Sequence, residues 1–110
     1  MLRKICSSLP AATEDVKWGN DLVFSVGDKM FCVASLGEPF SCSFKVQDDE
    51  FDELSNKAGF APAPYMARAK WVLVADPSKW KKSEWERYIE RSYELVKRKL
   101  TKKLRVELGI

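Results

Sequence analysis

The chain has 110 residues, 45% hydrophobic, 12% aromatic and 32% charged, with a formal net charge of +3. This length and composition predict one folded domain over residues 1–110 and exclude disordered and low-complexity classes. The chain contains no histidine, which removes Ser–His and Cys–His dyads and histidine-ligated metals.

Three cysteines, Cys6, Cys32 and Cys42, lack the CxxC spacing of a zinc finger. An odd number of cysteines also argues against a disulfide framework. The first residues lack the apolar core of a secretory signal, and no run of about 18 apolar residues predicts a membrane span. We therefore expect a cytoplasmic protein with free thiols, no bound metal or cofactor, and no contact with a membrane.

The first elements are a short helix and a loop. Apolar residues recur at helical spacing over residues 2–9, and Pro10 ends that helix. Residues 11–20 are expected to form a loop, with at most a brief strand over residues 16–18.

The clearest strand signal is a hairpin. Apolar runs at residues 22–26 and 30–34 flank Gly-Asp, a pair typical of a two-residue turn. Regular pairing places Phe24 opposite Phe31 and puts Cys32 on the other face. Residues 40–46 then alternate with period two, which predicts a strand whose buried face includes Cys42. On this parity we expect no disulfide between the two cysteines.

Three acidic residues at 48–50 begin a short helix that runs to about residue 58. Acids are favourable at a helix start, which is a simpler interpretation than a metal site. Residues 60–65 contain two prolines, which cannot donate backbone hydrogen bonds. We expect an extended loop there, serving either packing or recognition, followed by a strand over residues 71–75.

The last predicted element is a long helix. Ser83 and Glu86 have the spacing of a capping box, and an apolar stripe follows, which we assign to the core: Trp85, Tyr88, Ile89, Ser92, Tyr93, Val96 and Leu100. The elements together predict an α+β fold, with an antiparallel β-sheet of about four to five strands packed against helices.

Charge is uneven along the chain. Residues 1–55 hold five basic and ten acidic residues, whereas residues 56–110 hold fourteen and six. The stretch from Leu95 to Arg105 contains six basic residues and no acidic one. Cations near a helix C-terminus stabilise that helix, so these residues form either an ordinary helix end or a surface for anions such as nucleic acid.

Several ordered motifs resemble those of the MmcQ/YjbR family. They are the LPAATE segment from Leu9, the VFSVGDKMF hairpin from Val23, Pro64-Tyr65 followed by Trp71, SYELV from Ser92 and LTKKL from Leu100. The resemblance implies a CyaY-like (frataxin-like) topology and a domain of the double-wing DNA-binding type, and it carries over neither catalytic residues nor iron binding. Ala11 stands where the family usually has glycine, from which we expect a less strained turn.

DNA binding is the leading functional hypothesis. Phosphate contact needs clustered Lys and Arg, and no side chain lies on a recognisable base-reading helix. Asp28 at the hairpin tip argues against this hypothesis. The candidate contacts are Arg68, Lys70, Lys97, Arg98, Lys99, Lys102, Lys103 and Arg105, with Lys29 and Lys45 as second-rank candidates on the strands.

The alternative is a protein-interaction or adaptor domain. Its surface would use the proline-rich loop and exposed aromatic side chains, with Trp80 and Tyr65 as candidates. We expect a monomer or a weak dimer in either case. Catalysis is not expected, because the chain lacks histidine and shows no GxSxG, P-loop or GxGxxG motif.

Overall fold

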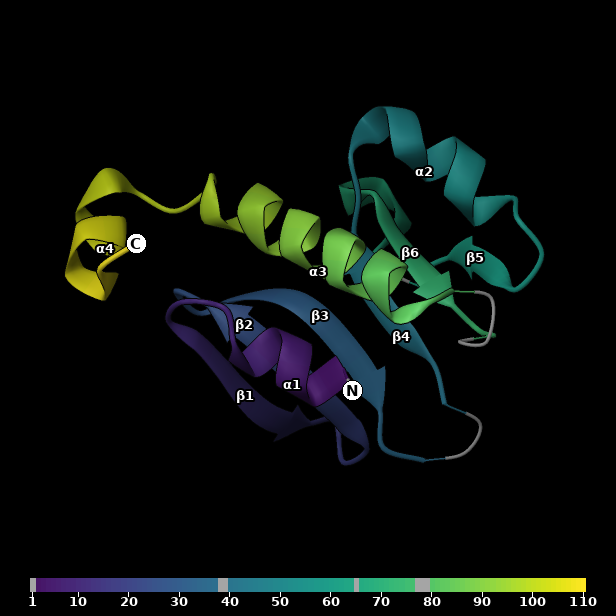
Figure 1. The fold of residues 1–110 in the computed structure, drawn as a ribbon, viewed down its shortest axis with the longest axis horizontal. Helices are drawn as coiled ribbons and strands as arrows, with labels where there is room; N and C mark the ends of the chain where they lie inside the picture. The colour runs from purple at the N-terminus through teal and green to yellow at the C-terminus, as the bar shows by residue number, and fades with distance from the viewer. Residues whose placement is uncertain (1, 38–39, 65, 77–79) are drawn as a thin grey trace.

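The computed structural model describes residues 2–37, 40–64, 66–76 and 80–110. The elements in chain order are α1 (Leu2–Ser7), β1 (Ala12–Lys17), β2 (Asp21–Val26), β3 (Lys29–Ser35), β4 (Cys42–Lys45), α2 (Asp48–Ser55), β5 (Phe60–Pro62), the 3-10 turn η1 (Ala67–Ala69), β6 (Trp71–Val74), α3 (Lys82–Lys97) and α4 (Lys102–Leu108). All strand pairs are antiparallel, in the order β1-β2-β3-β4-β6-β5 (Figure 1). The predicted α+β class is confirmed. Among the described residues, no helix has the length and apolarity to cross a bilayer.

The sheet has six strands rather than the predicted four to five, because β5 was not expected and β1 is longer than the brief strand predicted over residues 16–18. β1 pairs with β2 along its whole length, but nearly all its side chains are exposed, so it shows no apolar alternation. β5 includes Pro62, which we had placed in an irregular loop. An edge strand tolerates proline because one side of its backbone has no partner strand.

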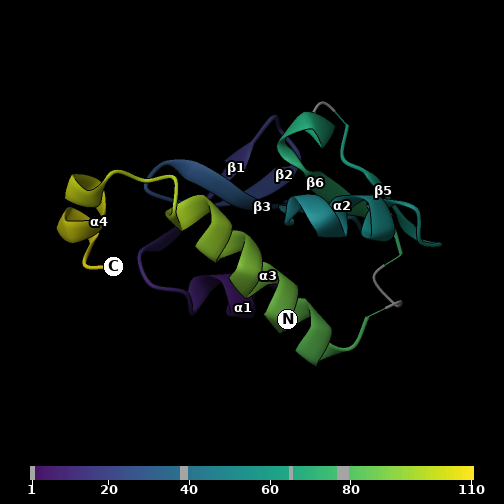
Figure 2. The same ribbon diagram turned by 90° about the horizontal axis from the view of Figure 1, so that it is seen from above.

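The two faces of the sheet differ in what covers them. α1 and α3 lie across one face, and α2 lies beside β5 and β6 (Figures 1 and 2). The helix-covered face carries a buried row of paired residues, Phe24, Cys32, Phe44 and Val72. Side chains alternate between the two faces of a sheet, so the neighbouring row of Val33, Ser43 and Leu73 points to the opposite face.

A β-bulge overturns the predicted hairpin register. The turn itself is the predicted two-residue one, with Val26 paired to Lys29, but the register shifts between Phe24 and Ser25. Phe24 therefore pairs with Cys32 instead of Phe31, because Phe31 is the extra residue of the bulge. Ser92 of α3 supports this irregularity. Its hydroxyl donates to the Phe31 carbonyl at 2.6 Å and accepts from the Lys45 N–H at 3.0 Å.

The bulge also overturns the parity argument about the cysteines. Cys32 and Cys42 lie on the same buried face with their sulfur atoms 3.4 Å apart, and Cys6 lies beside them. All three are free thiols, as expected. The hydrogen bond with Cys42, a second with Cys6 and burial raise the pKa of the Cys32 thiol well above its ordinary value.

This raised pKa predicts a loss of stability in alkali. The Cys32 thiol of the unfolded chain ionises near pH 8.5, whereas the folded one keeps its proton. The unfolded state then binds fewer protons, so the free energy of unfolding falls above that pH by up to about 1.4 kcal/mol per pH unit from this thiol. Urea unfolding at pH 8 and pH 10 should show a shallower fall for Cys32→Ala than for the wild type. Equal falls would contradict the assignment.

The turn after α1 is more strained than expected. Ala11 has φ of +60°, a left-handed conformation that costs an L-residue about 1–2 kcal/mol. The expectation of a less strained turn was therefore wrong, because alanine keeps the conformation that favours glycine. Tyr93 of α3 holds this turn through a hydrogen bond from its hydroxyl to the Pro10 carbonyl.

Ala11→Gly is expected to stabilise the fold by about 0.5–1 kcal/mol, after glycine's greater freedom in the unfolded chain is allowed for. Thermal unfolding should register a rise in Tm of roughly 3 °C. Ala12→Gly is the matched control and should lower Tm, because Ala12 lies in β1 without a positive φ. A fall in Tm for Ala11→Gly would contradict this account.

Two details of α3 differ from the prediction. The helix begins at Lys82, and Glu84 rather than Glu86 caps it, accepting from the Lys81 backbone N–H at 3.2 Å. Trp80, expected to be exposed, is buried and stacks on Tyr88 with ring centroids 4.5 Å apart. The predicted core stripe of α3 is confirmed, since its members are buried or half-buried.

Candidate nucleic-acid interface

The β2–β3 turn and the C-terminal helices meet at one end of the molecule. Gly27 and Asp28 have φ of +56° and +65°, which suits a tight hairpin turn. A Cβ on Gly27 would lie 2.8 Å from Leu100 and 3.2 Å from Leu104, so the turn packs directly against the α3–α4 connection. Both views place α4 at that end of the hairpin (Figures 1 and 2). This contact brings Lys29, the residue after the turn, to the same end as the basic run.

The basic run is divided between two helices, whereas we had expected one helix end and a short tail. α3 ends at Lys97, and Thr101 caps α4 by accepting from the Leu104 N–H at 3.1 Å. Lys102 and Lys103 are exposed residues of the first turn of α4. Cations are unfavourable at a helix N-terminus. The explanation by helix stabilisation therefore fails for these two lysines, although it holds for the end of α3.

We call this surface the basic end. Its members are Lys29, Lys97, Arg98, Lys99, Lys102, Lys103 and Arg105. Lys97 is half-buried with its ammonium 5.9 Å from the Tyr93 ring, and Arg105 is half-buried with a buried Nε that has no hydrogen-bond partner among the described residues. The other five are exposed.

Lys45 extends the basic end along β4. Its ammonium donates to the Ala69 carbonyl, and burial followed by the neighbouring Lys99 lowers its pKa, with Asp48 acting in the opposite direction. Lys99 is thus close enough to disfavour the charge of Lys45, and an anion at this place would relieve that repulsion.

Arg68 and Lys70 form a separate group near η1. Arg68 is exposed, whereas Lys70 is half-buried and has its ammonium 5.0 Å from the centre of the Phe51 ring of α2. No measured contact joins either side chain to α4. The structure thus gathers seven of the ten predicted residues at one end and adds Lys45 through Lys99. Arg68 and Lys70 adjoin Lys45, which contacts the Ala69 carbonyl between them, but not the helices of that end.

None of the ten predicted residues forms an ion pair among the described residues. The ion pairs that do form lie elsewhere: Arg3 with Glu14, Lys82 with Glu86, and Arg91 with Glu50. Asp28 remains at the hairpin tip as an exposed acid beside the basic end. The described residues contain no group of three or more Cys, Asp or Glu side chains arranged to hold a metal ion.

Sequence reasoning missed the face of the sheet opposite α1 and α3. No described α-helix covers this face, and we call it the helix-free face. A pocket of about 760 Å³ lies there, and Trp18 and Asp21 are among its lining residues. The only sequence signal was Trp18, which lies in the predicted loop three residues before Asp21. Hydrophobic periodicity does not identify such a residue as part of a site. Tyr65, a candidate of the alternative hypothesis, lies outside the described residues.

Comparison with known proteins agrees with the motif resemblance. A family model described as YjbR matches residues 7–95. Protein DR2400 from Deinococcus radiodurans, with a domain described as DUF419, superimposes with a TM-score of 0.87 at 29% identity, over 99% of this chain and 86% of that one. A protein from Pseudomonas syringae shares the fold, with a TM-score of 0.62 at 23% identity over 77% of this chain and 86% of its own. No curated protein matches the chain.

Proposed function

The chain belongs to the YjbR family, and we propose that it binds duplex DNA through the basic end without catalysing a reaction. One observation carries this proposal. Cations from three segments, the start of β3, the end of α3 and α4, share one end of the molecule without an ion pair among the described residues. An unneutralised cluster of this kind attracts a polyanion and releases its counterions on binding.

The contacts would be with phosphate rather than with bases. Lysine and arginine side chains that project from a short helix and a turn can follow the backbone of a duplex. The basic end carries no asparagine or glutamine for a two-point contact with adenine. We therefore expect binding with weak sequence preference and a strong dependence on salt.

Fluorescence anisotropy with a labelled duplex tests this proposal. About four phosphate contacts predict a slope near −3.6 for log affinity against log salt, which is roughly a hundred-fold loss between about 50 and 200 mM. A single strand of the same length should bind with a smaller slope. Absence of binding at the lower salt would refute the proposal.

The protein-interaction alternative has less support from its own candidate residues. Trp80 is buried in the aromatic cluster and offers no exposed anchor.

We propose further that the domain acts in the cytoplasm as a monomer or weak dimer without a cofactor, since the chain shows no cofactor motif. The CyaY-like topology stays a prediction, which superposition on a frataxin structure would test.

A further inference from the structure

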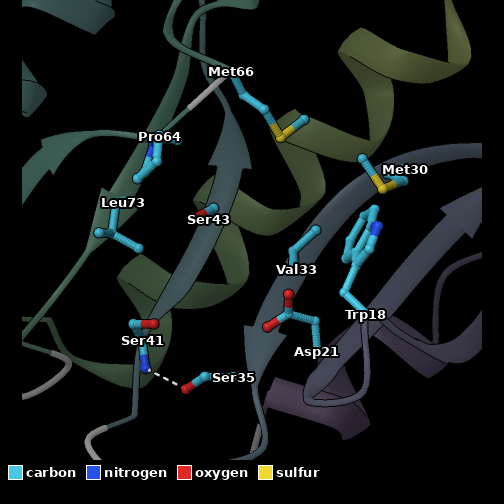
Figure 3. A pocket seen from close by; sticks show the side chains of 11 residues that line it. Trp18, Asp21, Met30, Val33, Ser35, Ser41, Ser43, Pro64, Met66 and Leu73 are labelled. Atoms are coloured by element: carbon cyan, nitrogen blue, oxygen red, sulfur yellow. Dashed lines mark hydrogen bonds between the residues drawn. The ribbon is translucent and has the colours of Figure 1, made fainter.

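The pocket on the helix-free face lies over the middle of the sheet and extends to Met30, the residue after Lys29. It is lined by Trp18, Asp21, Met30, Val33, Ser35, Ser41, Ser43, Ala63, Pro64, Met66 and Leu73 (Figure 3). Its floor is the row in which Val33 pairs with Ser43 and Ser43 pairs with Leu73, across three neighbouring strands. A volume of about 760 Å³ is within the range of small-molecule sites in proteins.

Trp18, in the turn between β1 and β2, is the exposed aromatic side chain of this pocket. It is 68% exposed, whereas the other three tryptophans are buried. Its φ is +53°, a genuine outlier for a bulky residue. Trp18 and Gly19 both have positive φ, as the tight turn between β1 and β2 requires. The exposure of the indole at the pocket, rather than its backbone conformation, is therefore what points to binding.

Asp21 supplies the charge of the pocket. It is half-buried at the start of β2, and its carboxylate makes no hydrogen bond or ion pair with any described residue. Lys17 is its partner in the β1–β2 ladder, yet the two side chains form no ion pair. Asp21 is the one ionisable group in the described lining, and the remaining polar groups are serine hydroxyls. Figure 3 shows Trp18 and Asp21 on the same side of the pocket, with Trp18 to the right of Val33 and Asp21 below it in that view.

We propose that this pocket binds a small organic cation, a free molecule with an apolar body and a protonated amine. The ammonium group lies between the face of the Trp18 indole and the Asp21 carboxylate. Cation–π attraction and an ion pair then act on the same charge. The apolar body lies along Val33 and Leu73 of the floor and the neighbouring Met30 and Met66 side chains, and the adaptable methionines fit bodies of different shape. An anionic ligand is disfavoured, because it would meet a carboxylate with no cation in the described lining.

Three probes of one shape and different charge test this proposal: 4-phenylbutylammonium, 4-phenylbutan-1-ol and 4-phenylbutyrate. Amide and indole resonances in two-dimensional NMR locate each probe, and titration gives its Kd. The ammonium should bind about ten-fold more tightly than the alcohol, the butyrate should bind most weakly, and the shifts should centre on Trp18. Asp21→Asn should reduce the ammonium-to-alcohol ratio from about ten to about three, the share that the Trp18 cation–π contact retains, while the alcohol Kd stays the same.

Two controls separate binding from folding and from DNA. Asp15→Asn removes an exposed acid in β1, outside the pocket lining, and should leave every Kd unchanged. Trp18→Asn should weaken all three probes about ten-fold yet raise Tm by a few degrees, since asparagine tolerates a positive φ. Equal affinity for the ammonium and the alcohol, an unchanged ratio in Asp21→Asn, or no binding at millimolar probe would overturn the proposal. None of these outcomes depends on whether the basic end binds DNA.

Discussion

Lys102→Glu/Lys103→Glu is expected to lower duplex DNA affinity at least about 100-fold at 50 mM salt. The variant removes two phosphate contacts and adds two repulsive charges in the exposed first turn of α4. The slope of log affinity against log salt should change from near −3.6 to about −1.8 as two counterions fewer are released. The fold should be retained, because acids are favourable at a helix N-terminus.

Lys81→Glu/Lys82→Glu is the matched control. It makes the same change of charge at another adjacent pair of exposed lysines, at the start of α3. That start lies at the opposite end of α3 from α4 (Figure 1). This control should lose only the small affinity that follows from net charge. A similar loss in both variants would mean that the protein attracts DNA by total charge and that the basic end is no site.

Ser92→Ala is expected to lower the free energy of unfolding by about 3 kcal/mol. The hydroxyl of Ser92 is fully buried, and it satisfies both the Phe31 carbonyl at the bulge and the Lys45 N–H of β4. Alanine would leave a buried acceptor and a buried donor unpaired, and each costs about 1–3 kcal/mol. Thermal unfolding should show a fall in Tm of about 12 °C.

Ser83→Ala is the control for this change on the same helix. Ser83 is exposed in the first turn of α3, so its replacement should alter stability by no more than about 0.5 kcal/mol. A loss below about 1 kcal/mol in Ser92→Ala would contradict the role assigned to this serine. It would mean that other groups form hydrogen bonds with the Phe31 carbonyl and the Lys45 N–H in the absence of the hydroxyl.

Elements with strong periodicity were predictable from the sequence, and elements without it were not. The stripe of α3 and the Gly-Asp turn could be predicted because they depend on local sequence rules, and the structure confirms both. β1 is an edge strand held by backbone pairing, and its exposed side chains carry no pattern. The bulge at Phe31 was unpredictable for another reason, because its stabilising partner, Ser92, is 61 residues away.

The candidate site was predictable as a set of residues but not as a surface. The density of lysine and arginine identified Lys97 to Arg105 directly. Their convergence with Lys29 depends on the packing of Gly27 against Leu100, which is a tertiary contact. The helix-free pocket had no sequence signal beyond Trp18, because its floor combines single residues from three strands.

The most direct test of the central claim is to map the DNA contact by NMR, with a short duplex titrated into ¹⁵N-labelled protein at low salt. The account predicts the largest amide shifts in one contiguous set, from Lys29 at the start of β3 and from residues 97–105, with little change around Trp18. Shifts centred on η1 or on the helix-free face would contradict the claim that the basic end is a nucleic-acid interface. The absence of any shift would contradict it as well.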